Sequence, residues 1–362
     1  MPSAREVIAG VVALPREAGT PEAAAARALL AAHLAGLGYR LEEQRFGFPP
    51  SSLAAYPILG AGLGWLALLE FPLLTLPSVP SWSALAAWLA GLTALSCLTL
   101  GLGMGWTPPG TDLREDANLI ATRGGGPIRR WIVAHSDTKA QGHSMAGRLV
   151  AVWVILLSTV TVSALVVSRL AGPLSLWGAG GGVGLTLLAG VLAGRGGLKG
   201  RSPGARDNGT GLLAALVAAE QSRDPTVGIL ITGAEEFGLV GARVFARRLG
   251  SGLTGVEVVN LDTLDDAGPL YVVTHDRRSD RLAERLAGRL APGGRSVRRR
   301  RLPLGILVDS LPLARAGSLA VTVSRLNWGS LRVMHTPGDT PDRLSWETAE
   351  LVGRAVAADL ED

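Results

Sequence analysis

The stretch Thr232-Gly-Ala-Glu-Glu-Phe-Gly-Leu-Val-Gly241 decides how the rest of the chain is interpreted. It continues an apolar run, Val227–Thr232, that predicts a buried strand. The adjacent carboxylates of Glu235 and Glu236 follow this strand, where they are costly unless a positive group lies opposite them. Since neighbouring side chains point in different directions, one carboxylate can ligate a metal while the other handles a proton. A solvated acidic loop is the alternative, and the surrounding sequence favours a site.

The composition indicates a membrane protein. Of the 362 residues, 48% are hydrophobic and only 18% are charged, and the mean hydropathy is +0.31, which is too apolar for an ordinary soluble enzyme. The net charge of +5 comes almost wholly from arginine, since lysine occurs only at Lys139 and Lys199. The basic runs lack interleaved aromatic residues, so we expect no nucleic-acid partner and favour anionic lipid headgroups. The single cysteine, Cys97, excludes an intrachain disulfide.

Four nearly uncharged stretches are long enough to cross a bilayer, which takes roughly 20 residues. We expect them to form two transmembrane hairpins, with spans at 53–76, 82–106, 149–168 and 174–194. Glu70 interrupts the first span, and it lies either at the membrane interface or paired inside the membrane. Pairs of small residues four positions apart allow close helix packing and a homo-oligomer: Gly60/Gly64, Gly178/Gly182 and Gly180/Gly184.

The distribution of charge around these spans predicts the topology. Between the spans of each hairpin the only cation is Arg169, whereas many arginines flank the other ends. The positive-inside rule therefore predicts an integral protein of a bacterial-type plasma membrane, with four transmembrane helices and a cytoplasmic catalytic domain. The expected segments are catalytic 1–52, hairpin 53–107, catalytic 108–147, hairpin 148–195 and catalytic 196–362.

Outside the hairpins, short apolar runs alternate with helical patterns. This alternation predicts an α/β fold with a mostly parallel central sheet flanked by helices, with the two hairpins inserted into it. In such sheets, ligands bind at the carboxyl ends of the strands. Polar motifs lie at those ends or in adjoining loops: His135-Ser-Asp137, Gly204-Ala-Arg-Asp207-Asn-Gly209, Asn260-Leu-Asp262 and His335-Thr-Pro-Gly-Asp339. Imidazoles and carboxylates without a thiolate suit Zn²⁺, with Co²⁺ or Mn²⁺ possible.

Together with Glu235-Glu236, these motifs resemble, in order and chemistry, the M28 family of zinc aminopeptidases. The resemblance implies a zinc aminopeptidase-like fold and two co-catalytic Zn²⁺ ions per chain. Asp207 would bridge the two ions, His135 and Asp262 would complete one position, and Glu236 and His335 the other.

The resemblance also implies roles for residues beside the ligands. Glu235 would be the general base that acts on the metal-activated water. The carboxylate of Asp137 would accept the second ring N–H of His135, and Asp339 would do the same for His335. A cis peptide is expected at Asp207–Asn208. The implied function is a membrane-bound exopeptidase that removes N-terminal residues from peptides with a free N-terminus.

The sequence also departs from the family pattern. Arg206 stands where an acid or a small residue is usual, and 308–313 only loosely resembles the family's Asp-His-x-Pro-Phe segment. Two alternatives stay open: a glutaminyl cyclase-like acyltransferase with a single zinc, and an inactive membrane scaffold with a peptidase-like domain. Each histidine or acid taken singly is more often structural than catalytic, and it is their joint occurrence that favours an enzyme.

Overall fold

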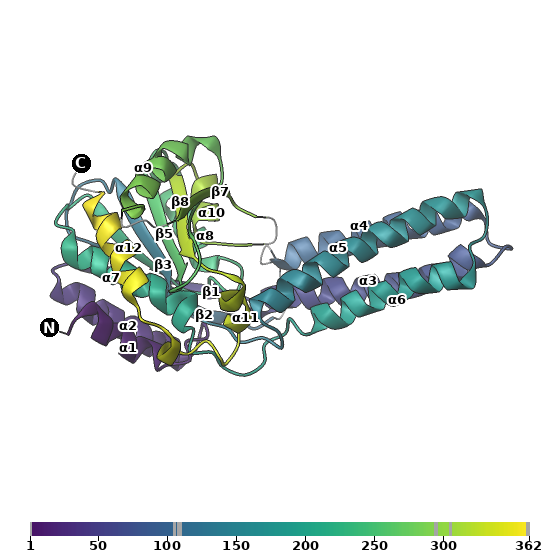
Figure 1. Ribbon diagram of the computed structural model, residues 1–362, viewed down its shortest axis with the longest axis horizontal. Coiled ribbons are helices and arrows are strands. Elements are labelled where there is room, and N and C mark those ends of the chain that lie inside the picture. Colours follow the sequence, from purple (N-terminus) through teal and green to yellow (C-terminus); the bar gives the residue numbers. More distant parts are fainter. Residues whose placement is uncertain (1, 104–105, 107–110, 293–295, 304–305, 360–362) are drawn as a thin grey trace. The chain divides into compact units, whose positions relative to one another are not determined.

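The computed structural model of the chain describes residues 2–103, 106, 111–292, 296–303 and 306–359 (Figure 1). The chain divides into two compact units. The first comprises 1–48, 113–140 and 200–362, and the second comprises 49–112 and 141–199.

An eight-stranded mixed sheet forms the centre of the first unit, in the order β1-β2-β4-β3-β5-β8-β6-β7. The strands are β1 (Arg40–Phe48), β2 (Arg114–Thr122), β3 (Arg130–His135), β4 (Val227–Thr232), β5 (Glu257–Leu264), β6 (Leu270–Thr274), β7 (Val297–Arg301) and β8 (Leu319–Arg325). The central strands β4, β3, β5 and β8 run parallel to one another, and β6 and β7 also pair in parallel, whereas the pairs β1–β2, β2–β4 and β6–β8 are antiparallel. The α/β prediction is confirmed, in the form of a mixed sheet whose four central strands are parallel.

Helices cover both faces of this sheet (Figure 1). One face packs against α1 (Ala4–Val12), α2 (Pro21–Gly36), α7 (Gly211–Gln221), α9 (Asp280–Leu290) and α12 (Glu347–Ala358), and the other against α8 (Val240–Leu249) and α10 (Ser310–Arg315). The predicted helix start at Thr20 is confirmed, since the Thr20 side chain accepts from the Ala23 amide and Pro21 takes the first position. All residues of α7 from 211 to 219 are buried, which explains its uniformly apolar sequence.

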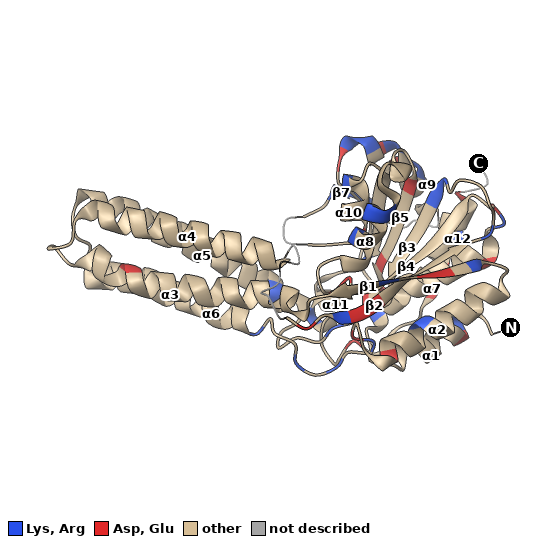
Figure 2. Ribbon diagram, turned by 180° about the vertical axis from the view of Figure 1, so that it is seen from behind, with Lys and Arg blue, Asp and Glu red and all other residues tan. Residues whose placement is uncertain are grey.

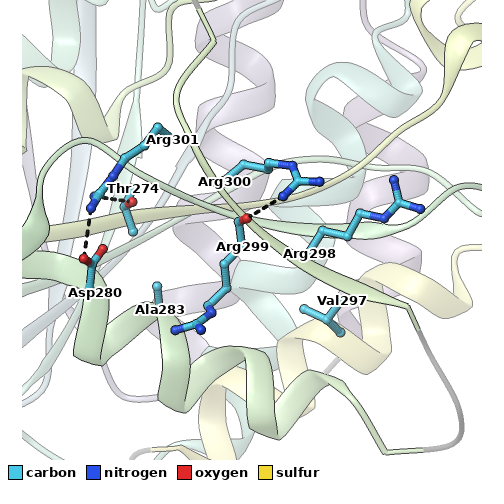
Figure 3. Close-up of a pocket in the computed structure, with 8 residues that line it drawn as sticks. All are labelled: Thr274, Asp280, Ala283, Val297, Arg298, Arg299, Arg300 and Arg301. Atoms are coloured by element: carbon cyan, nitrogen blue, oxygen red, sulfur yellow. Dashed lines mark hydrogen bonds and ion pairs between the residues drawn. The ribbon is translucent and has the colours of Figure 1, made fainter.

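The outermost strand β7 carries arginine at positions 298–301 (Figure 3). Alternate residues of a strand face opposite sides, and Arg299 and Arg301 pair with Glu284 and Asp280 of α9, at 3.7 and 2.9 Å. A shallow hollow opens beside these side chains, and none of the expected metal ligands lines it. The exposed arginines fit a solvated edge strand, which charge protects against pairing with other chains.

Four long helices form the second unit: α3 (Ala55–Thr75), α4 (Ser81–Gly103), α5 (Met145–Ser168) and α6 (Leu176–Gly194). All four are long and apolar enough to cross a membrane, and Figure 2 shows almost no charge along them. Positions 104–105 of the expected second span lie outside the described residues.

Small residues bring α3 and α6 together. A Cβ on Gly190 would lie 2.9 Å from the Gly60 carbonyl oxygen, and a Cβ on Gly60 would meet Ala193 at 2.2 Å. Such close approach is typical of small residues in membrane helices. Glu70 is fully buried on the same face of α3 as Gly60, Gly64 and Ala67. It therefore faces the helix bundle, as an acid within a span is expected to do.

Arg169, the single cation expected in the turns, is buried in the second unit. Its guanidinium donates to the carbonyls of Leu73 at 2.9 Å, Leu76 at 3.0 Å and Val79 at 2.7 Å. It therefore ties the turn of one hairpin to the turn of the other.

Candidate metal centre

Parallel strands bring the sequence-predicted residues to one edge of the sheet. His135 is the last residue of β3, the Glu235-Glu236 pair follows β4, and Asp262 lies near the end of β5. Asp207 lies in the turn Ala205–Thr210 before α7, and His335 follows α11 (Trp328–Val333). The expected cis peptide is present at Asp207–Asn208.

One group of donors consists of His135, Asp207 and Asp262, whose ligand atoms lie within 4.8 Å of one another. His135 Nε2 is 3.1 Å from Asp207 Oδ1 and 3.9 Å from Asp262 Oδ1. His135 and Asp207 are buried and Asp262 is intermediate. This is the first of two positions that can hold a cation.

The second group consists of Asp207, Glu236 and His335, again with ligand atoms within 4.8 Å. His335 Nε2 lies 3.1 Å from Asp207 Oδ2 and 3.3 Å from Glu236 Oε1. Asp207 therefore offers one carboxylate oxygen to each group. This is the arrangement that a bridging ligand needs, and the structure brings together all five residues expected to be ligands.

The donor set fits zinc. Two imidazole nitrogens and three carboxylates are ligands that Zn²⁺ accepts, and each group contains one histidine. Among the described residues, Glu236 Oε1 is buried and accepts no hydrogen bond, although His335 Nε2 lies 3.3 Å away. A buried carboxylate oxygen of this kind is expected to bind a cation or another donor.

Backbone strain is concentrated at the same loops. Three residues other than glycine have positive φ here: Ala234 (50°) before the glutamate pair, Thr263 (54°) after Asp262, and His335 (62°). Such conformations cost of order 1–3 kcal/mol each and are typical of functional sites.

Asp137 has a different role from the expected one. Its carboxylate accepts the amide N–H groups of Glu235 at 3.0 Å and Glu236 at 3.1 Å. The atom within hydrogen-bond distance of His135 Nδ1 is instead the main-chain carbonyl oxygen of Asp137, at 3.0 Å, while the carboxylate lies 3.7 Å away. Asp137 therefore fixes the ring of His135 through its backbone and the glutamate loop through its side chain.

The expectation that Asp339 binds His335 is wrong, because its carboxylate is engaged elsewhere. Asp339 accepts the amide N–H groups of Arg206 at 3.0 Å and Asp207 at 3.1 Å. His335 Nδ1 is buried without a hydrogen-bond partner among the described residues. Asp339 thus positions the backbone of Asp207.

Arg206, which departs from the family pattern, is buried and paired with two acids. Its Nε lies 3.0 Å from Asp265 Oδ2, and its Nη1 lies 3.4 Å from Asp339 Oδ1. The arginine therefore compensates the charge of Asp339, whose carboxylate accepts the Asp207 amide.

Two further residues at the centre were not anticipated from the sequence. Lys139 is buried, with Nζ 2.5 Å from Glu236 Oε2, so one oxygen of this carboxylate faces an ammonium while the other faces the donor group. Asp309 is fully buried and accepts a short hydrogen bond from Thr232. The only signal for Asp309 was its place in the loosely matching segment 308–313, and no motif pointed to Lys139.

The buried charges shift the pKa values of the residues in the two donor groups. Burial raises the pKa of Asp262 to about 7. Burial disfavours the charge on Asp207 as well, but hydrogen bonds to His135 and His335 hold its pKa below the usual range. The pKa of Glu236 is lowered to about 2, because Lys139 and His335 outweigh its burial.

Glu235 belongs to neither donor group. Its burial, together with the nearby carboxylates of Glu236 and Asp309, raises its pKa well above the usual value, although His135 opposes this shift. A buried carboxyl beside the ligands, with a raised pKa and no ligand role, has the properties of a general base.

Comparisons with known proteins agree with this fold. The model of Peptidase family M28 matches residues 192–359, while curated proteins give no match. The structure is similar to an aminopeptidase from Aneurinibacillus sp. strain AM-1, with 16% identity, a TM-score of 0.56, and coverage of 98% of this chain and 92% of the other. It is also similar to BSAP, a zinc aminopeptidase from Bacillus subtilis, with 16% identity, a TM-score of 0.57, and coverage of 99% and 94%. A glutaminyl cyclase from Fimbriiglobus ruber gives 16% identity, a TM-score of 0.57, and coverage of 99% and 93%. At these identities the solved structures establish the fold.

Proposed function

Since this chain is an M28-family, zinc aminopeptidase-like protein, we propose that it is a membrane-bound, metal-dependent exopeptidase that removes N-terminal residues from peptides. The observation that carries this proposal is the placement of Asp207, which offers one oxygen to each of two donor groups. Carboxylate-bridged pairs of metal ions are typical of hydrolases that attack amide bonds.

His135, Asp207 and Asp262 would hold one Zn²⁺, and Glu236 and His335 would complete a second position with Asp207. When bound, the ions supply Lewis acidity that polarises the scissile carbonyl and activates the attacking water. A free α-amine is a further ligand that such a centre accepts, which would restrict cleavage to the N-terminus.

Glu235 moves the proton in this proposal. Its carboxylate takes a proton from the attacking water and delivers it to the leaving nitrogen, and its raised pKa makes it a stronger base for the first of these transfers. Asp137 holds the glutamate loop still, because its carboxylate accepts both amide N–H groups of the pair. Lys139 holds Glu236 in one orientation, with Oε1 toward His335.

One observation favours a second candidate, a glutaminyl cyclase-like acyltransferase that uses a single metal. The Lys139 ammonium occupies one oxygen of Glu236 and reduces the negative charge available to the second position. Two ions are nevertheless the expectation, because both donor groups are complete.

The four apolar helices support an integral membrane location. The arginine-rich flanks of the spans favour a cytoplasmic catalytic unit. We further propose the bilayer and peptides with a free N-terminus as partners, and self-association through the glycine-rich helices.

The test combines metal counting with substrate discrimination. The full chain, purified in detergent and loaded with Zn²⁺, is expected to hold two ions and to release the N-terminal residue from free but not N-acetylated peptides. The control variant Asp207→Asn should lose both metal and activity, because it weakens both donor groups. Cyclisation of a peptide with N-terminal glutamine, with one ion bound, would establish the second candidate. Loaded protein that performs neither reaction would refute the proposal.

A further inference from the structure

Arg16 is a fully buried cation between α1 and α2. Its guanidinium donates to three main-chain carbonyls outside its own segment, those of Ser136 at 2.8 Å, Pro203 at 2.6 Å and Gly204 at 3.1 Å. A planar guanidinium with five N–H donors can serve several acceptors at once, which an ammonium on a flexible stem cannot do with the same geometry.

These carbonyls belong to the two loops that carry metal ligands. Ser136 directly follows His135, and Gly204 begins the turn that leads to Asp207. The backbone strengthens the same connection, because the Thr138 amide donates to the Arg16 carbonyl oxygen at 3.0 Å. Arg16 therefore holds the His135 loop and the Asp207 loop at a fixed distance from each other.

The two loops also pack directly against each other. The Thr138 hydroxyl donates to the Ser202 carbonyl at 3.2 Å. Gly204 has φ of 55°, and a Cβ there would lie 2.2 Å from Thr138 Cγ2. Any loosening of Arg16 is thus transmitted to a tight contact on which both ligands depend.

The chain connectivity explains why such a clamp is needed. The second hairpin enters between these loops, since the chain leaves the first unit at Ala140 and returns at Gly200. An insertion without tertiary contacts does not hold its two ends together. Bringing the ends together costs entropy, and this cost grows slowly with the length of the insertion. Arg16 restrains them from a third segment of the chain.

The charge of Arg16 also suits this place. Asp137, Asp207 and Asp339 lie close enough to favour its protonated form, while burial lowers its pKa to about 10. It therefore stays charged at neutral pH and offsets part of the negative charge of the centre.

We propose that Arg16 is a positioning residue of the metal centre, which fixes His135 and Asp207 by holding the backbones of their loops. The inference rests on the proposed function, because it concerns the metal site of that function. Two of the three residues of the first position, His135 and Asp207, lie on the loops that Arg16 holds. Loss of Arg16 should therefore weaken metal binding at this position by more than a general loss of stability would.

Arg130 is a matched control. It is a buried arginine at the opposite end of β3 from His135, and it pairs with Glu257 and, at 2.9 Å, with Asp359. Arg130→Met therefore removes a buried cation from the same strand without touching either ligand loop. If an effect comes only from removing a buried arginine, Arg16→Met and Arg130→Met should both show it.

The experiment measures Zn²⁺ affinity of the metal-free full chain by competition with a chelating dye, and the visible spectrum at saturating Co²⁺. Arg16→Met is expected to bind Zn²⁺ about 10–100-fold more weakly, the range for loss of a group that orients a metal ligand, and to show an altered Co²⁺ spectrum. Arg130→Met should change neither by more than about threefold, even if it lowers stability. Arg16→Lys, which keeps the charge but not the fork of donors, should lie between wild type and Arg16→Met and provides a milder variant.

Wild-type affinity and spectrum in Arg16→Met or Arg16→Lys, or equal losses in Arg16→Met and Arg130→Met, would overturn the inference while leaving the proposed function intact. Wild-type protein that binds no Zn²⁺ would instead refute the proposed function, and with it the premise of the inference.

Discussion

The adjacent residues Glu235 and Glu236 allow a sharp separation of roles. Glu235→Gln removes a proton acceptor but leaves every atom of both donor groups in place. Glu236→Gln removes one of the three donors of the second position and deprives Lys139 of its carboxylate. Any general damage to the loop should affect both variants alike, because the residues are neighbours.

The expected magnitudes differ in kind. Loss of a general base costs on the order of 10²–10⁴ in kcat, which is about 2.7–5.4 kcal/mol at 1.36 kcal/mol per decade. Glu235→Gln should therefore show a large fall in turnover with wild-type metal content. Glu236→Gln should lose stability by about 3–5 kcal/mol, because the ammonium of Lys139 is buried and left unpaired. Its metal affinity should fall by more than the ~10–100-fold typical of residues that only orient a ligand.

Three measurements on each purified variant decide the matter: metal per chain, kcat on a free peptide, and the midpoint of urea unfolding. Added Zn²⁺ should not restore Glu235→Gln, whereas it should partly restore Glu236→Asp, which keeps a carboxylate. If Glu235→Gln loses its metal or keeps full activity, the division of labour between the two glutamates is wrong.

The remaining predictions concern protonation, a buried ion pair and topology. Since the pKa of Asp262 is raised to about 7 and that of His135 well above its usual value, both must lose protons to bind Zn²⁺, so affinity should rise with pH. Calorimetry in two buffers would count the protons released when Zn²⁺ binds. The variant Asp262→Asn should release fewer protons than wild type. A Zn²⁺ affinity that does not change with pH would contradict this expectation. Arg206→Met leaves two buried carboxylates without their cation. It should lower the free energy of unfolding in urea by about 3–5 kcal/mol, and Arg206→Lys should lower it by less. An unchanged unfolding midpoint in Arg206→Met would refute the pairing. Single cysteines at 77–81 or 169–173, in a cysteine-free background, should be labelled from outside intact cells, and labelling of the catalytic unit instead would reverse the topology.

The fold and the ligand set could be predicted because they depend on local patterns. Apolar runs such as Val227–Thr232 identify buried strands, and polar residues directly after such runs fall at one sheet edge. This explains why residues as distant as His135 and His335 could be placed together, while their roles as ligands stay predictions. No strand was expected at β2, because its first three residues are charged, whereas the charged run 298–301 of β7 is typical of a solvated edge strand.

The supporting contacts could not be predicted, because they join residues far apart in sequence. Lys139 meets Glu236 at a separation of 97 positions, and Arg16 meets Ser136 at 120. The residues next to Lys139 or Arg16 in the sequence do not show that these side chains will be buried. Asp137 illustrates a second limit, since a spacing of two residues lets either its carbonyl or its carboxylate approach His135, and only the backbone conformation decides between them.

The points at which the hairpins leave the first unit suggest a route to a form of the protein without its apolar helices. Phe48 and Arg114 are paired residues of the antiparallel strands β1 and β2, so the first hairpin occupies the place of an ordinary β-turn. Thr138 and Ser202 are hydrogen-bonded at the base of the second. A hairpin loop of two to five residues is enough to join antiparallel strands, and a short linker can replace the second insertion. Such a truncated protein would keep every ligand and every clamp described above, and it would allow crystallisation and kinetics without detergent.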